Sequence, residues 1–127
     1  MLRQRNGAAR KVLLIDGDEY NIRVAGSFLY ACGYPDVTVA RSAKEAIDKF
    51  TDRFCLVLIN VYLPDKSGLE VCKNLRQLSK SKGLPILALA PKGKGMRTKC
   101  FKVGMSNVMP SPTSFQGFKE AVQRVIN

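Results

Sequence analysis

Short continuous apolar runs alternate along the chain with segments whose apolar residues recur every three or four positions. The runs lie at 12–15, 37–40, 55–59 and 84–90, with a weaker one at Val108 and Met109. Short runs without interposed polar residues are typical of strands that are buried on both faces of a sheet. The pattern therefore predicts five strands.

The segments between and after these runs have the spacing of amphipathic helices. Their apolar positions are Val24, Phe28 and Ala31 in the first; Ala43, Ala46, Ile47 and Phe50 in the second; Leu69, Cys72 and Leu75 in the third; and Phe115, Phe118, Val122 and Val125 in the last. A fourth helix is expected near 96–103, although Gly93 and Gly95 weaken its start. Five helices are thus expected to alternate with the five strands.

Residues that start and end helices support these boundaries. The spacings Ser42-x-x-Glu45, Ser67-x-x-Glu70 and Thr113-x-x-Gln116 are capping boxes at the expected starts of the second, third and last helices. Gly33 closes the first helix. Because parallel neighbours need crossover connections, the alternation predicts an α/β fold in which helices cover both faces of a parallel sheet.

In such a sheet the functional cleft lies at the carboxyl ends of the strands, beside the switch in strand order. The loops expected there are 16–18, 60–66, 90–95 and 110–112. The length of 127 residues suits one domain, predicted over 11–127, with 1–10 as a flexible lead-in or linker remnant. These four loops therefore contain the residues to inspect for chemistry.

Composition excludes several classes of function. No apolar run approaches the roughly 20 residues of a membrane span, and no signal-peptide pattern follows the basic start, so we expect a cytoplasmic protein without membrane contact. The four cysteines have no C-x-x-C spacing and the chain has no histidine. Hydrolase triads built on Ser-His or Cys-His are excluded, no zinc site is expected, and the cysteines are interpreted as reduced structural thiols.

The net charge of +11 is unevenly distributed. Between Val71 and Lys119 there is no Asp or Glu. The basic residues in this stretch are Lys73, Arg76, Lys80, Lys82, Lys92, Lys94, Arg97, Lys99, Lys102 and Lys119. Either an acidic partner binds this half, or the charges form a solvated surface that aids solubility; both interpretations stay open.

Three stretches resemble the receiver domain of two-component response regulators: KVLLIDGDEYN at 11–21, LVLINVYLPDKSG at 56–68 and LPILALA at 84–90. The resemblance runs from about Lys11 to Ile126. It implies a flavodoxin-like, doubly wound sheet of five parallel strands in the order 2-1-3-4-5 with five helices. KCFKVGMSN at 99–107, followed by Pro112, is similar to receivers attached to hybrid histidine kinases, as is Asn21.

The resemblance also implies a chemistry. Receivers take a phosphoryl group from a histidine kinase onto an Asp at the end of the third strand, with a magnesium ion held partly by an acidic pair after the first strand. A hydroxyl residue ending the fourth strand and a lysine ending the fifth bind the phosphoryl oxygens. Such a site needs a carboxylate nucleophile, oxygen ligands for a hard cation and donors for the transferred charge.

This chain departs from that pattern at almost every position. Asp16 matches the first acid, Gly17 stands for the second, Asp18 is shifted by one, Asn60 stands at the phosphoacceptor, Ala90 replaces the hydroxyl residue, Ser111 replaces the lysine and Val108 replaces the aromatic switch residue. An amide is a far poorer nucleophile than a carboxylate and forms no acyl phosphate. We therefore predict a pseudo-receiver: no enzyme, no cofactor, and a magnesium site that is lost or weak.

Two alternatives concern the pocket itself. A displaced acid, Asp18 or Asp65, could act as a residual phosphoacceptor; structural roles are Asp18 as cap of the first helix and Asp65 in a turn beside Pro64. Lys92, two residues after Ala90, could pair with Asp16 in place of the metal or the lysine. A lysine that faces solvent is the competing interpretation.

The predicted mode of action is contact with a protein. Receivers commonly use the face formed by the fourth helix, fifth strand and fifth helix, which here would carry Lys94, Arg97, Lys99, Lys102, Met105, Val108 and Lys119. The expected partner is an acidic protein, a neighbouring kinase or output domain in a longer chain, or a second copy in a homodimer. Nucleic-acid or other polyanion binding is the alternative, but no recognition motif or aromatic series accompanies the charges.

Overall fold

The computed structural model describes residues 10–80, 83–111 and 113–126. The elements are β1 (Lys11–Ile15), α1 (Glu19–Ala31), β2 (Val37–Ala40), α2 (Ala43–Lys49), β3 (Phe54–Asn60), α3 (Gly68–Leu78), β4 (Ile86–Ala90), α4 (Met96–Lys102), β5 (Asn107–Pro110) and α5 (Phe115–Ile126). The predicted lead-in up to residue 9, Lys82 and Pro112 lie outside the described residues. None of the helices in the described part is long and apolar enough to cross a membrane.

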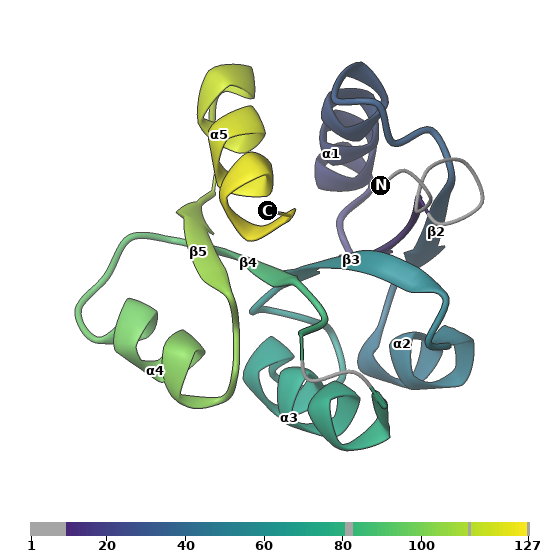
Figure 1. Ribbon diagram of the computed structural model, residues 1–127. Helices are drawn as coiled ribbons and strands as arrows, with labels where there is room; N and C mark the ends of the chain where they lie inside the picture. The colour runs from purple at the N-terminus through teal and green to yellow at the C-terminus, as the bar shows by residue number, and fades with distance from the viewer. Residues whose placement is uncertain (1–9, 81–82, 112, 127) are drawn as a thin grey trace.

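The five strands form one parallel sheet in the order β2-β1-β3-β4-β5, which confirms the predicted topology. Helices α1 and α5 cover one face, and α2, α3 and α4 cover the other (Figure 1). Alternate strand residues therefore enter two separate cores: Leu13 and Ile15 pack toward α2, α3 and α4, whereas Val12 and Leu14 pack toward α1 and α5. This two-sided burial explains the continuous apolar runs.

Short polar side chains start four of the helices as N-caps. Asp18, Ser42 and Ser67 accept hydrogen bonds from the backbone N–H groups of Asn21, Glu45 and Leu69, as their positions predicted. The prediction for the last helix was wrong by one residue. Ser114 is the residue that caps α5, because its Oγ accepts a 3.0 Å bond from the Gly117 N–H.

The fourth strand also begins later than predicted. The apolar run starts at Leu84, but β4 begins at Ile86 because Pro85 has no N–H for the ladder. Pro85 contributes only its carbonyl, which accepts a 2.9 Å bond from the Val57 N–H. The predicted start of the fourth helix near residue 96 agrees with the structure. Helix α4 starts directly after Gly95, whose φ is 76°.

One glycine is required by a close approach of two backbones. Gly68 is the first residue of α3 and is buried against the end of β3. A Cβ at this position would lie 2.5 Å from the carbonyl oxygen of Asn60 and 2.7 Å from the Cα of Val61. The start of α3 is therefore held directly against the backbone of Asn60.

Arg76 connects α3 to two other segments, the residues just before β4 and the turn after α4. Its guanidinium donates to the Gly104 carbonyl at 2.9 and 2.6 Å and to the Leu84 carbonyl at 2.7 Å. Ser106, which follows, accepts a 3.0 Å bond from the Ile86 N–H and so extends the same connection to β4. Arg76 thus belongs to the scaffold and not to a free basic surface.

Arg10, the last residue of the predicted lead-in, contacts the domain. Its guanidinium donates a 3.0 Å hydrogen bond to the Gly33 carbonyl. The same group lies 5.1 Å from the centre of the Tyr34 ring, within cation–π range. Arg10 was assigned to the lead-in, but it packs on the domain.

Candidate functional site

The candidate site lies where β1 and β3 end side by side. Asp16 directly follows β1, and Asn60 is the last residue of β3, two strands that are neighbours in the sheet. Asp16 is only 3% exposed, and no other charged side chain is buried among the described residues. A buried carboxylate needs partners, because an uncompensated charge is costly away from water.

Asn60 supplies one of these partners. Its Nδ2 donates to Asp16 Oδ2 at 3.1 Å, and the Asp18 N–H donates to Asp16 Oδ1 at 3.0 Å. The other end of the Asn60 amide is occupied too, since its Oδ1 accepts a 2.8 Å bond from the Tyr62 N–H. The Tyr62 bond orients the amide so that its NH₂ group faces Asp16.

At Gly17, where the resemblance implied a second acid, the surrounding residues leave little space for any side chain. A Cβ built on Gly17 would lie 3.0 Å from Pro64 Cδ and 3.2 Å from the Arg41 carbonyl oxygen. Contacts this short require a neighbour to move, and both neighbours are a ring or backbone. An acidic side chain at position 17 would therefore need the loop after β3 to shift.

The residues present do not fit a magnesium ion. Mg²⁺ prefers oxygen ligands in near-octahedral geometry. Here both oxygens of Asp16 accept hydrogen bonds from the protein, and Asn60 presents N–H groups toward them. Over the described part of the chain, no group of three or more His, Cys, Asp or Glu side chains gathers as a metal site.

The two displaced acids hold helix starts. Asp18 Oδ1 accepts from the Asn21 N–H at 3.0 Å, in the capping role that its position predicted. Asp65 reaches from the loop after β3 to α2, where it accepts from the N–H groups of Ala43 at 2.8 Å and Lys44 at 3.1 Å. The bond from Ala43 is the main reason that the pKa of Asp65 is lowered. Sequence reasoning placed Asp65 in a turn and missed this tertiary contact.

The described ends of β4 and β5 carry Ala90 and Ser111 where the resemblance implied a hydroxyl residue and a lysine. Ala90 is buried and has no side-chain donor, and the Ser111 N–H is bound to the Ala90 carbonyl at 3.1 Å. A cavity of about 240 Å³ lies between this strand end and α4, lined in part by Ala90, Arg97 and Val108. The small Val108 side chain lies at its wall, where the resemblance implied an aromatic ring.

The predicted pairing of Lys92 with Asp16 is not formed. Lys92 is exposed and lines the cavity beside Ala90. No ion pair found within the described ranges includes Lys92. The physical reason is that Asp16 already has its partners in the Asp18 N–H and the Asn60 amide.

The residues predicted to form one partner face lie in different parts of the structure. Met105 is 3% exposed and belongs to the core, so its place on that face was wrong. Arg97 is held across α4 and β5, donating to the Val108 carbonyl at 3.3 Å while its guanidinium lies 4.9 Å from the Phe101 ring centre. Lys94 is exposed in the loop before α4.

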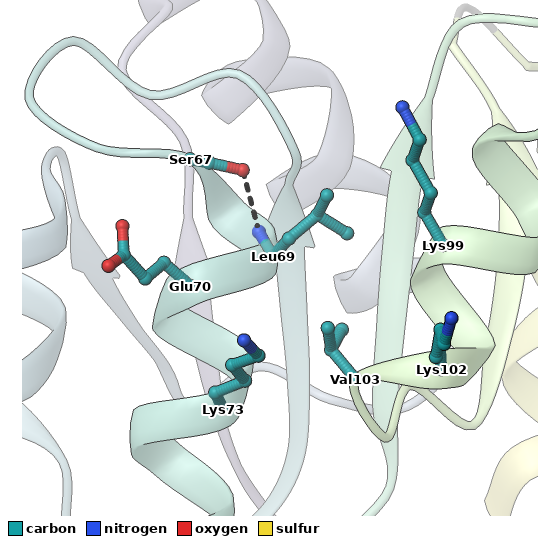
Figure 2. Close-up of a pocket in the computed structure, with 7 residues that line it drawn as sticks. All are labelled: Ser67, Leu69, Glu70, Lys73, Lys99, Lys102 and Val103. Carbon is teal, nitrogen blue, oxygen red and sulfur yellow. Dashed lines mark hydrogen bonds between the residues drawn. The ribbon is translucent and has the colours of Figure 1, made fainter.

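The remaining basic residues of that set point elsewhere. Lys119 lies on α5, and its charge partly opposes the rise that burial causes in the pKa of Cys32 at the end of α1. Lys99 and Lys102 line a groove between α3 and α4, together with Lys73 (Figure 2). Sequence reasoning did not find this groove. The i, i+3 spacing of the two lysines was its one local signal.

The model of the response regulator receiver domain family matches residues 12–123. This chain therefore belongs to the response regulator receiver domain family. A similar solved structure is the non-phosphorylated HemR receiver domain from Leptospira biflexa, with a TM-score of 0.81, 28% identity, and coverage of 92% of this chain and 94% of that one. The predicted family and flavodoxin-like fold are thus confirmed.

Curated relatives include longer signalling proteins. The chain is 30% identical over 118 residues to the aerobic respiration control sensor protein ArcB of Escherichia coli K12, covering 91% of this chain and 15% of that protein. It is 26% identical over 122 residues to hybrid signal transduction histidine kinase L of Dictyostelium discoideum, covering 90% and 7%. A CpxR homolog of Haemophilus influenzae is 29% identical over 103 residues, covering 80% and 44%. The chain thus spans less than half of each of these relatives.

Proposed function

We propose that this chain is a receiver domain that accepts no phosphoryl group and acts in two-component signalling through phosphorylation-independent contact with a protein. The hydrogen bond from Asn60 Nδ2 to Asp16 Oδ2, at 3.1 Å, carries the proposal. Phosphoryl acceptance needs a carboxylate oxygen at position 60 and a cation beside it. The amide removes the nucleophile, and its N–H group donates to an Asp16 oxygen that would be needed as a cation ligand.

The surroundings of this bond support the same conclusion. Gly17 is closely approached by Pro64, Ala90 brings no donor and Ser111 brings no positive charge. Asp18 and Asp65 are engaged with the starts of α1 and α2, which argues against either as a substitute acceptor. Four separate parts of the reaction would have to be restored, so a single substitution is not expected to restore it.

The proposed partner is a kinase or an output domain, on the same polypeptide or on another one. The relatives include a hybrid histidine kinase and a transcriptional regulatory protein, and in each of them the matched region is less than half of the length. We further propose a cytoplasmic location, where such partners operate. A homodimer through α4, β5 and α5 is a narrower version of the proposal, and analytical ultracentrifugation across a concentration series tests it.

Mass spectrometry tests the loss of phosphoryl acceptance directly. The natural chain, its Asn60→Asp variant and an authentic receiver are incubated with magnesium and acetyl phosphate. We expect the phosphoryl mass increment on the authentic receiver and none on the natural chain. A hydroxylamine-sensitive increment on the natural chain would mean that another acid serves as acceptor, and the proposal would be wrong.

Amide NMR spectra provide a second readout that does not depend on a stable covalent bond. Beryllium fluoride with magnesium imitates the phosphoryl group on an aspartate. We expect the spectrum of the natural chain to stay unchanged on addition of both, while that of the authentic receiver shifts around its site. Shifts clustered at Asp16 and Asn60 in the natural chain would contradict the proposal.

A further inference from the structure

A groove of about 290 Å³ runs between α3 and α4, on the sheet face opposite α1 and α5. Its lining consists of Ser67, Leu69, Glu70, Lys73, Lys99, Lys102 and Val103. Figure 2 shows Lys73 on α3 and Lys99 and Lys102 on or beside α4, with Leu69 and Val103 between the helices. The groove therefore combines an apolar floor with three cationic side chains at its edges.

Within the described part of the chain, the three lysines form no ion pair with an acid. The described residues form four ion pairs, and all of them involve residues of the first half of the chain. Glu70 is the one acid in the lining, and Figure 2 shows its carboxylate on the side of α3 that faces away from α4. Because Glu70 is the one acid in the lining and no Asp or Glu occurs between Val71 and Lys119, the groove keeps an excess of positive charge.

A purely structural role explains part of this arrangement only. Lys99 and Lys102 lie in the last turn of α4, where positive charge is favourable to the helix dipole. Lys73 lies in the middle of α3 and gains no such benefit. Its position opposite the other two concentrates charge across the groove, which costs repulsion in the isolated domain and favours an anionic occupant.

The walls of the groove are held in place before anything binds. Arg76 of α3 bonds to the Gly104 carbonyl just beyond α4, and Cys72 Sγ lies 3.5 Å from the Val103 carbonyl oxygen. Leu69 and Val103 pack against the core from the groove floor. A preformed site loses little conformational entropy on binding, which favours affinity for a short segment.

The chemistry of the lining selects among anionic occupants. An apolar floor between lysines suits a side chain such as leucine flanked by carboxylates. No aromatic ring lines the groove, so it offers no stacking platform for nucleic-acid bases. The lining thus favours an acidic peptide over a single-stranded nucleic acid.

We propose that the groove between α3 and α4 is a docking site for an acidic peptide segment of a protein partner, with one apolar residue seated on Leu69 and Val103 and carboxylates paired with Lys73, Lys99 and Lys102. The proposal deepens the proposed function, because it rests on a receiver that acts through protein contact. It places that contact on α3 and α4 and not on the face formed by α4, β5 and α5.

Fluorescence anisotropy with a labelled Asp-Glu-Leu-Glu-Asp peptide tests the site. The Lys99→Ser/Lys102→Ser double variant is expected to weaken binding about tenfold, since two direct charge contacts with the peptide are lost. The matched control is Lys92→Ser/Lys94→Ser, which removes the same net charge from exposed positions outside the groove. We expect the control to change the affinity less than about twofold, because exposed charges act weakly at a distance in salt. Equal weakening by both variants, or no measurable binding to the natural chain, would overturn the proposal.

Two further ligands make the chemistry specific. A peptide in which serine replaces the leucine should bind several-fold more weakly, because the apolar floor then loses its contact. A single-stranded oligonucleotide of equal charge should bind more weakly than the peptide and should respond equally to the groove and control variants. An oligonucleotide that binds more tightly and loses its affinity only in the groove variant would overturn the peptide assignment.

The outcome is separable from that of the proposed function. Peptide binding is measured without phosphodonor, and the phosphoryl assay does not involve the groove. Absence of the peptide site together with absence of phosphorylation would remove the groove proposal alone. A phosphorylated natural chain that still binds the peptide at Lys99 and Lys102 would remove the proposed loss of phosphoryl acceptance alone.

Discussion

The strand ends around Asp16 and the groove between α3 and α4 differ in whether their charged side chains have partners within the chain. At the strand ends, the buried Asp16 carboxylate is stabilised by hydrogen bonds from the Asn60 amide and the Asp18 N–H of the same chain. In the groove, three exposed lysines have no counter-ion among the described residues. Both oxygens of the Asp16 carboxylate thus accept hydrogen bonds from the chain itself, whereas the lysines of the groove are exposed to solvent.

The two regions are joined through the backbone of the fold. Gly68 connects the two regions, because it begins α3 while its backbone lies against Asn60. The loop between β3 and α3 is held by Ser67 and Asp65 to the starts of α3 and α2. The same loop therefore supports the groove wall whether or not position 60 can react.

The largest expected effect comes from Asn60→Asp, which removes the hydrogen bond from the Asn60 amide to the Asp16 carboxylate. The introduced carboxylate would face Asp16 at hydrogen-bond distance, and we expect a loss of about 2 kcal/mol in the free energy of unfolding at neutral pH. Repulsion raises the pKa of one of the two carboxyls above its unfolded value. The folded state then holds a proton that the unfolded state releases, so the variant should regain stability as the pH falls toward about 5.

Urea unfolding at several pH values measures this effect, with magnesium as the sharpening ligand. Two facing carboxylates fit a hard cation, so magnesium should stabilise the variant and leave the natural chain unchanged. Equal stabilisation of both proteins by magnesium would show that the natural site already binds the ion. The contrast with the groove would then no longer hold.

A smaller effect is expected from Asp65→Asn, which removes a charge from the rim of the site. The N–H groups of Ala43 and Lys44 lower the pKa of Asp65 in the folded chain. A lowered pKa contributes stability that is present above the unfolded pKa of about 4 and is lost as the pH falls through the folded value. The natural chain should therefore be more stable than the variant at neutral pH, and the difference should vanish in acid.

Thermal unfolding from neutral to acidic pH measures this difference. Asp48→Asn is the matched control. Asp48 is exposed, as Asp65 is, but it lies on α2 and pairs with Lys44 across one helical turn. We expect the control to show a weaker dependence on pH. A constant offset between Asp65→Asn and the natural chain at every pH would exclude the carboxylate charge as the cause.

The smallest effect is expected from Lys99→Ser/Lys102→Ser. Among the described residues neither lysine has an acidic partner to lose, so only the interaction with the helix dipole is removed and the free energy of unfolding should fall by about 1 kcal/mol or less. Urea denaturation checks this value, and the same samples serve for the peptide titration. A loss well above that value would assign the lysines to the fold, and the contrast between a closed site and an open groove would fail.

Local sequence patterns were reliable where local physics decides. Asp18, Ser42 and Ser67 cap their helices as predicted, since an N-cap needs only a short acceptor side chain next to the first turn. At the last helix, Thr113 and Ser114 both meet that need, and the pattern chose the wrong one. Neighbouring residues of the same chemistry cannot be separated by spacing alone.

Contacts between distant segments were the ones that were missed. Asp65 reaches α2 across more than twenty residues of sequence, with a separation of 22 to Ala43. Arg76 finds the Gly104 carbonyl 28 residues away, although composition alone placed it among free basic residues. Met105 was placed on a surface, but the turn after α4 directs it into the core. None of these contacts has a periodic signal, because each depends on how helices pack on the sheet.

The sequence by itself determined the order of elements, the parallel sheet and the identity of the residues at the strand ends. Those properties follow from apolar periodicity and from which side chain stands at each carboxyl end, both of which are local. Only the tertiary structure decided that the Asn60 amide turns toward Asp16, that Lys92 stays apart, and that lysines of α3 and α4 share one groove. Hydrogen-bond direction and the distance between charges depend on the relative placement of separate elements, which packing of the whole domain sets.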